Sequence, residues 1–296
     1  MIGLFDSGAG GLTVLRALVQ RFPEQSFVYL GDHANAPYGD RPASEVVALT
    51  RAGVVRLFDR GCRLVLLACN TATAVACREL QQNWLPHAGY PDHNVLGIVA
   101  PTVEAATQTP WAVQTPQYPQ KFATGTIGVF GTRRTVDSAV YPEEIRKRCP
   151  RMQVVQQACP SLVRGIEGAW ADELLRERVT TYVEAMLAQV PAQAPENALE
   201  RVVLGCTHYP LLEAHFRDAL PSTIRLLAQP TAVADSLDDY FTRHPHYAVR
   251  EEASPGSEGR QVTMLTTGPA ARDADPHSGA LRAFWPDLPP FEPIGT

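Results

Sequence analysis

Two stretches decide the fold of this chain, Arg63-Leu-Val-Leu-Leu-Ala-Cys69-Asn-Thr71 and Arg201-Val-Val-Leu-Gly-Cys206-Thr-His208. Each is a short apolar run that ends in a cysteine and leads into a helical pattern. Such a run predicts a buried parallel strand followed by a helix. Because open α/β sheets bind ligands at the carboxyl ends of their strands, the two thiols predict one site that is approached from two sides.

A structural role for these cysteines is the competing interpretation, since free cysteine is among the residue types most often found buried. For a single cysteine at a strand end the two interpretations are about equal. Here both cysteines are followed by polar pairs, Asn70-Thr71 and Thr207-His208. A buried core has no need of such pairs, so we favour a functional role for both thiols.

The duplication extends beyond the cysteines. Ile2-Gly-Leu-Phe-Asp-Ser-Gly8 resembles Ile127-Gly-Val-Phe-Gly-Thr-Arg133, and both predict a strand, a tight turn and a helix. The order along the chain is therefore turn, cysteine, turn, cysteine. This order predicts two related halves, each of which supplies one glycine-containing turn and one strand that ends in cysteine.

Alternation of strand and helix patterns predicts an α/β fold with doubly wound, mostly parallel sheets. The expected strands are 2–5, 26–30, 64–69, 95–99, 126–130, 153–158, a strand that ends at 206, and 262–266. The expected helices are 12–19, 44–59, 72–82, one from about 138, 169–189 and 211–220. Residues 108–121 read as an exposed loop, and the Pro-rich C-terminal region reads as a tail packed on the surface.

Composition excludes several classes of partner. The chain has 296 residues and a net charge of −5, without a run of basic residues, which argues against binding to nucleic acid or to an anionic membrane surface. No segment approaches the roughly 20 apolar residues that span a bilayer. A strand pattern begins within two residues of Met1, so we expect no signal peptide and a cytoplasmic location with reduced cysteines.

The sequence also argues against cofactors and metals. Lys121 and Lys147 are the only lysines, and neither has the apolar setting that a pyridoxal phosphate Schiff base needs. The six cysteines contain no C-x-x-C pair, so a zinc site is not expected. We predict no cofactor and no metal.

The turn Asp6-Ser-Gly-Ala-Gly-Gly11 follows the first strand and opens a helix. Its glycine spacing matches neither a dinucleotide fingerprint nor a P-loop. Backbone N–H groups at a helix N-terminus nevertheless form an anion site, to which Ser7 adds a hydroxyl. Asp6 is either a helix N-cap or a carboxyl group that handles a proton near a thiol.

Two further turns supply hydrogen-bond donors. Ala36-Pro-Tyr-Gly-Asp-Arg41 presents the Tyr38 hydroxyl and the Gly39 N–H. Gly131-Thr-Arg-Arg-Thr135 presents the hydroxyls of Thr132 and Thr135, which suit a carboxylate, whereas we expect Arg133 and Arg134 to face solvent.

Two thiols that face one carbon predict inversion of a stereocentre by general acid–base catalysis. One thiolate removes a proton from one face while the opposing thiol protonates the other face. Because a free cysteine is only a few per cent thiolate at neutral pH, each thiol needs a helper. His208 is the candidate beside Cys206, and Asp6 ends a strand that we expect beside Cys69.

The motifs D-S-G-x-G-G, P-Y-G, A-C-N-T-A and G-C-T-H-Y-P-L-L, in this order, resemble those of glutamate racemase, the cofactor-independent enzyme that supplies D-glutamate for peptidoglycan. The resemblance runs from Met1 to about Phe241. It implies two pseudo-symmetric α/β domains with the substrate between them. We place the first at 1–98 plus 211–296 and the second at 99–210, and we expect a homodimer.

The resemblance also implies roles for individual residues. Cys69 would act on the D-face and Cys206 on the L-face, and Glu167, which follows the Ala158-Cys-Pro segment, would be an acidic helper. The implied catalytic residues are Cys69, Cys206, Asp6, His208 and Glu167. The implied contacts to L- and D-glutamate are Asp6, Ser7, Tyr38, Gly39, Asn70, Thr71, Thr132, Thr135, Thr207 and His208.

The chain departs from the family pattern at the long 108–121 loop, at Leu162 and in the tail beyond His244, but not at the cysteine motifs. Three alternatives stay open. They are a racemase of aspartate, a non-catalytic role such as binding a topoisomerase, and a hydrolase or transferase with one cysteine nucleophile.

Overall fold

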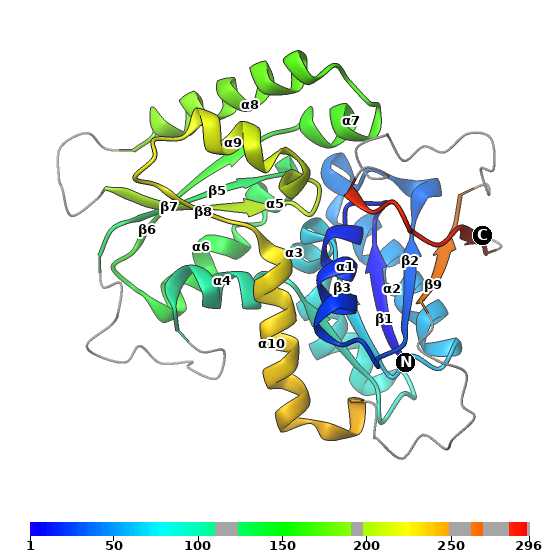
Figure 1. The fold of residues 1–296 in the computed structure, drawn as a ribbon. Helices are drawn as coiled ribbons and strands as arrows, with labels where there is room; N and C mark the ends of the chain where they lie inside the picture. The colour runs from blue at the N-terminus through cyan, green and yellow to red at the C-terminus, as the bar shows by residue number, and fades with distance from the viewer. Residues whose placement is uncertain (110–123, 191–197, 249–261, 269–283, 295–296) are drawn as a thin grey trace.

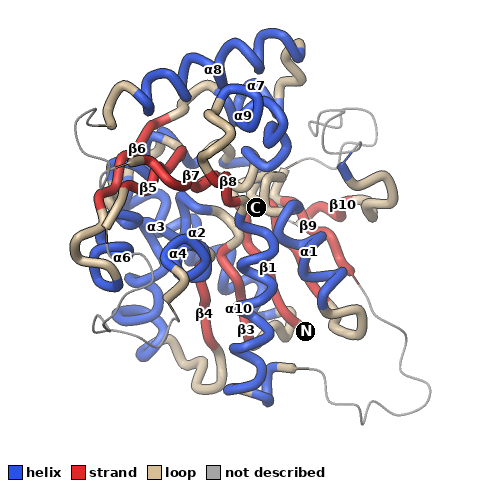
Figure 2. The backbone as a smooth tube through the Cα atoms, turned by 60° about the vertical axis from the view of Figure 1, so that its left-hand side comes forward, coloured by secondary structure: helices blue, strands red, loops and turns tan. Residues whose placement is uncertain are grey.

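The computed structural model describes residues 1–109, 124–190, 198–248, 262–268 and 284–294. The predicted loop beyond Thr109 and most of the predicted C-terminal tail lie outside these ranges. Figures 1 and 2 show two separate sheets with helices on both faces of each. The eight strand pairs within these ranges are all parallel, which confirms the predicted α/β class and the doubly wound sheets.

The first sheet has the strand order β10-β9-β2-β1-β3-β4. Its strands are β1 (Ile2–Asp6), β2 (Phe27–Gly31), β3 (Leu64–Leu67), β4 (Asn94–Gly97), β9 (Val262–Thr266) and β10 (Phe291–Pro293). The strand expected at 262–266 is confirmed as β9, but it is not packed on the surface, because it pairs with β2 along its whole length and buries Met264 and Leu265.

The second sheet has the order β6-β5-β7-β8, which repeats the order β2-β1-β3-β4 of the first. Its strands are β5 (Thr126–Gly131), β6 (Gln153–Ala158), β7 (Leu199–Gly205) and β8 (Arg225–Leu227). The repeat confirms the predicted relation between the two halves. In each sheet, one strand precedes a turn and its neighbour precedes a cysteine, so the switch point of each sheet carries a turn and a thiol.

In the described part of the chain, the apolar faces of the helices pack on the sheets and form four cores. On the first sheet, α1 (Leu12–Arg21) and α10 (Gln229–Arg243) cover one face, and α2 (Ala43–Asp59) and α3 (Asn70–Glu79) cover the other. On the second sheet, α7 (Leu162–Glu167), α8 (Asp172–Leu187) and α9 (Glu213–Ala219) cover one face, and α4 (Val99–Thr107) and α6 (Val140–Arg148) cover the other. The short α5 (Arg133–Asp137) follows β5.

Left-handed residues precede two of the predicted helices. The helix expected from about residue 138 is present as α6, and Ala139, with a φ of 55°, separates it from the short α5, which was not expected. Ala169 has a φ of 50°, and α8 begins at Asp172 instead of at the expected residue 169. A residue with a side chain is uncommon at positive φ outside a turn, so a local turn sets where both helices begin.

Strand pairing differs from the predicted division of the chain at one point. β8 pairs with β7, although residues 211–296 were assigned to the first domain. The chain returns to the first sheet only with α10, whose buried side chains join the core of β1 and α1. The division into domains otherwise stays a prediction.

Candidate active site

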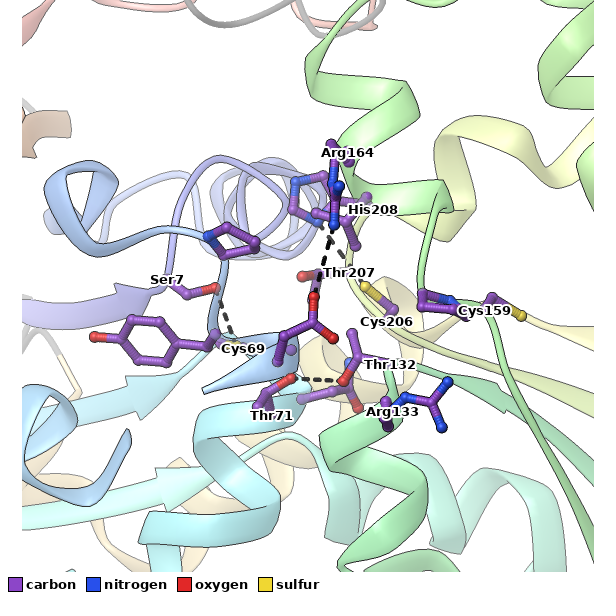
Figure 3. Close-up of a pocket in the computed structure, with 17 residues that line it drawn as sticks. Ser7, Cys69, Thr71, Thr132, Arg133, Cys159, Arg164, Cys206, Thr207 and His208 are labelled. Carbon is purple, nitrogen blue, oxygen red and sulfur yellow. Dashed lines mark hydrogen bonds and ion pairs between the residues drawn. The ribbon is translucent and has the colours of Figure 1, made fainter. Parts of the chain in front are cut away.

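A cavity lies between the two sheets, where the carboxyl ends of their strands meet (Figure 3). Its lining comes from the segments after β1, β2, β3, β5, β6 and β7. It is lined by Ser7, Pro37, Tyr38, Gly39, Asp40, Cys69, Asn70, Thr71, Thr132, Arg133, Cys159, Pro160, Val163, Arg164, Cys206, Thr207 and His208. Both predicted thiols thus line one cavity, Cys69 from the first half of the fold and Cys206 from the second.

Cys69 is held at the N-terminus of α3. Its Sγ lies 3.3 Å from Ser7 Oγ and accepts a hydrogen bond from the Ala72 N–H at 3.4 Å. Burial raises the pKa of the Cys69 thiol to about 12, and the nearby Asp6 adds to the rise, while Ser7 and the Ala72 N–H oppose it. At neutral pH, Cys69 is therefore a protonated thiol.

Cys206 contacts a histidine, and that histidine contacts a carboxylate. Its Sγ lies 3.9 Å from His208 Nδ1, and His208 Nε2 lies 2.9 Å from Glu167 Oε1. Burial by itself lowers the pKa of His208, but the contacts with Cys206 and Glu167 outweigh it and raise that pKa well above its ordinary value. The arrangement is a thiol–imidazole–carboxylate relay in which Glu167 orients the imidazole and favours its protonated form.

The glycine turn after β1 packs directly against this relay. A Cβ at Gly10 would lie 2.4 Å from His208 Nδ1. The hydroxyl of Thr13, at the start of α1, also donates to the Thr207 carbonyl at 3.0 Å. The turn of the first half therefore supports the cysteine loop of the second, and only a residue without a side chain fits beneath the imidazole.

Asp6 is 1% exposed and does not line the cavity. It is not an N-cap, because α1 begins after Gly11 and has no side-chain cap. Its Oδ2 accepts hydrogen bonds from the Gly8 N–H at 3.1 Å and the Tyr29 hydroxyl at 3.2 Å. Burial raises the pKa of Asp6, although His208 opposes the rise.

The predicted hydroxyl contacts form a cluster that joins the two halves. Thr71 Oγ1 lies 3.0 Å from Thr132 Oγ1, and Thr132 Oγ1 lies 3.1 Å from Thr135 Oγ1. Thr132 is also the N-cap of α5, because its Oγ1 accepts from the Thr135 N–H. Thr135 is fully buried and does not line the cavity, so it lies beneath Thr132 and has no direct access to a ligand.

Tyr38 lines the cavity, but its hydroxyl donates to another residue of the protein, whereas we expected it to donate to a ligand. The Tyr38 O–H donates to Asp32 Oδ2 at 2.5 Å, and Thr267 donates to Asp32 Oδ1 at 2.6 Å. The single hydroxyl proton is thus committed to Asp32, a buried residue that the sequence analysis did not single out. Its position just after β2, at the ligand-binding edge of the sheet, was the available signal.

Two arginines, Arg133 and Arg164, line the cavity. Arg133 is exposed, as predicted, yet it reaches the cavity, whereas Arg134 is half-buried and donates to the Arg41 carbonyl at 2.8 Å. Arg164 was not predicted, and its Nη2 lies 3.9 Å from Asp40 Oδ2 on the opposite half (Figure 3). Both arginines are open to solvent, so their charges are strongly screened.

Among the residues that the structure describes, no helix is long and apolar enough to cross a bilayer. Within the same ranges, no three His, Cys, Asp or Glu side chains form a group able to hold a metal ion.

Known proteins match nearly the whole chain. The glutamate racemase of Phenylobacterium zucineum is 45% identical over 99% of each chain, and that of Caulobacter sp. is 47% identical over 96% of each. The solved glutamate racemase of Thermus thermophilus, in complex with β-chloro-D-alanine, superposes with a TM-score of 0.73 at 28% identity over 99% of this chain and 96% of its own.

These matches confirm the resemblance to glutamate racemases. The model of the Asp/Glu/Hydantoin racemase family covers residues 3–237, which include both cysteine motifs and both turns. The chain is therefore an enzyme of the Asp/Glu/Hydantoin racemase family.

Proposed function

We propose that this enzyme interconverts L- and D-glutamate without a cofactor, by proton transfer between the substrate α-carbon and two cysteines. One observation carries the proposal: Cys69 and Cys206 line one cavity from opposite halves of the fold, and each has its own polar partner. A base on each face of a carbon is what inversion by proton transfer needs.

Cys206 is the base for L-glutamate. The imidazolium form of His208, which Glu167 favours, stabilises the Cys206 thiolate. The thiolate removes the α-proton and becomes a thiol, and the electron pair of the C–H bond passes to the α-carbon and its carboxylate.

Cys69 completes the reaction from the other face. Its thiol gives a proton to the α-carbon, which produces D-glutamate and leaves Cys69 as a thiolate. Because the pKa of Cys69 is raised to about 12, the free protein holds it as the acid and is ready for L-glutamate. The reverse reaction uses Cys69 as the base and Cys206 as the acid, and exchange with solvent resets both thiols.

Neutral donors hold the substrate. Ser7, Asn70, Thr71 and Thr132 line the cavity, and Cys69 stands at the N-terminus of α3, where free N–H groups favour an anion. Such donors stabilise the charge that develops on the carboxylate when the α-proton leaves. Aspartate shares the α-carbon chemistry, so the side-chain length of the substrate is part of the test.

The cellular setting follows from the same proposal. D-glutamate made by this enzyme would supply peptidoglycan synthesis in the cytoplasm, and a homodimer without a nucleic-acid or membrane partner is the expected form. The net charge of −5 supports the absence of a nucleic-acid partner.

Racemisation in D₂O tests the proposal. The purified chain is incubated with L-glutamate, D-glutamate or L-aspartate, and optical rotation and α-deuterium content are followed together. We expect deuterium in the product of both glutamate reactions and at least about tenfold slower turnover of aspartate, as one methylene in a pocket allows. Racemisation of glutamate without α-deuterium would refute the two-base mechanism, and faster turnover of aspartate would refute the substrate.

A further inference from the structure

We propose that Gln229 and Tyr141 are positioning residues that hold the side-chain amide of Asn70 in the one orientation that leaves an N–H for the substrate. This inference rests on the proposed function, because it takes Asn70 to bind glutamate. It assigns a role to two buried residues that do not themselves line the cavity.

The network joins four helices behind the cavity. Asn70 is the first residue of α3, directly after Cys69, and lines the cavity. Gln229 begins α10, Tyr141 lies in α6 and Thr102 lies in α4. All four side chains are at most 2% exposed, so their polar atoms have no bulk water as an alternative partner.

Asn70 and Gln229 form a reciprocal amide pair. Asn70 Nδ2 donates to Gln229 Oε1 at 2.5 Å, and Gln229 Nε2 donates to Asn70 Oδ1 at 3.0 Å. The Tyr141 hydroxyl donates to Asn70 Oδ1 at 2.7 Å. Gln229 Nε2 also lies 2.8 Å from Thr102 Oγ1 and 3.0 Å from the Tyr141 hydroxyl, so Gln229 is itself fixed on both sides.

One donor of the Asn70 side-chain amide remains available to a ligand. A primary amide has two N–H donors and one oxygen with two lone pairs. Both lone pairs of Asn70 Oδ1 are occupied, by Tyr141 and Gln229, and one N–H is given to Gln229 Oε1. The second N–H is the one group of this amide left to contact a ligand.

The same partners disfavour the flipped amide. If Asn70 turned by 180°, its NH₂ would face the N–H of Gln229 and its oxygen would face Gln229 Oε1, so both bonds of the amide pair would be replaced by contacts between two donors and between two acceptors. The Tyr141 hydroxyl would also lose Asn70 Oδ1 as the acceptor of its proton. Without Gln229 and Tyr141, both orientations become accessible, and the flipped amide would lose the N–H that an anionic substrate needs.

A double-mutant cycle on kcat and KM tests this role. Gln229→Ala, Tyr141→Phe and Asn70→Ala are measured singly, and the first two are also combined with Asn70→Ala. We expect Gln229→Ala to raise KM for glutamate about tenfold, the value of one hydrogen bond to a charged group, with kcat within about threefold. In the Asn70→Ala background, neither change should raise KM by more than about twofold, because a residue that acts through Asn70 has nothing left to orient.

Controls separate positioning from packing. Tyr240→Phe is the matched control for Tyr141→Phe, because it also removes the hydroxyl of a buried tyrosine. Tyr240 lies near the C-terminal end of α10, where its hydroxyl accepts from Asn94 Nδ2 at 2.8 Å, so its replacement should leave KM unchanged. Thermal unfolding of each variant reports the structural cost, and Tyr141→Phe, which keeps the ring in place, carries the test if Gln229→Ala does not fold. Equal losses with and without Asn70 would overturn the positioning role alone. A wild-type chain that does not racemise glutamate would overturn the proposed function and this inference with it.

Discussion

Glu167→Gln tests the relay behind Cys206, because it removes the charge of the carboxylate and keeps its size. Glu167 Oε1 lies 2.9 Å from His208 Nε2, and the Glu167 side chain is 26% exposed. Hydrogen bonds to charged groups contribute about 1.5–3 kcal/mol, and partial exposure favours the lower part of that range. At 1.4 kcal/mol per tenfold change, we expect kcat to fall about 10- to 30-fold.

The pH dependence of kcat should also change in Glu167→Gln, and the direction of that change can be predicted. The active form pairs a Cys206 thiolate with a His208 imidazolium, so activity is lost as pH rises through the pKa of His208. Glu167 helps to raise that pKa above its ordinary value. Its replacement by glutamine lets His208 lose its proton at a lower pH, and the alkaline limb of the kcat profile should therefore move to lower pH.

The assay is the initial rate of optical rotation with L-glutamate across pH. Asp172→Asn is the matched control, because Asp172 Oδ1 lies 2.8 Å from His215 Nε2 in an equivalent pair that does not line the cavity. It should leave kcat within about twofold, as surface substitutions usually do. An equal loss in both variants, or an alkaline limb that stays in place or moves up, would refute the relay.

Three other predictions follow from the same geometry. Cys69→Ser and Cys206→Ser should each lower racemisation by about 10²–10⁴-fold, the usual contribution of a general acid or base, and a variant that keeps a tenth of the wild-type rate in polarimetry would instead indicate a single-nucleophile enzyme. Gly10→Ala places a Cβ 2.4 Å from His208 Nδ1 and should displace the imidazole. We expect kcat to fall at least about tenfold and the free energy of unfolding to fall by about 1–3 kcal/mol because of overpacking. A variant with the wild-type kcat would contradict the importance of this contact. Burial raises the pKa of Asp6 in the native state above its unfolded value, so the ionised carboxyl destabilises the fold increasingly as pH rises above about 4. Asp6→Asn should therefore raise Tm at pH 7 more than at pH 4, and an equal change in Tm at both values in calorimetry would show that burial of the charge is not the cause.

The fold class and the central strands were predictable because their signals are local. An apolar run with a polar end predicts a buried strand wherever its neighbours lie, and β1, β3, β5 and β7 all follow this pattern. β8 was missed because it has only three residues and a charged first residue. α10 was missed although its buried apolar residues recur at helical spacing, at Val233, Ala234, Leu237, Tyr240 and Phe241, so this helix could have been predicted.

The sequence by itself determined that two thiols follow equivalent strands and that residues with hydroxyl or amide groups lie next to them along the chain, because residue type and strand order suffice for both. Only the tertiary structure decided what each group contacts. The Tyr38 proton goes to Asp32, Thr135 lies beneath Thr132, and Gln229 reaches Asn70 from 159 residues away. Hydrogen bonds between distant segments depend on how helices pack across two sheets, and no local pattern of residues encodes that packing.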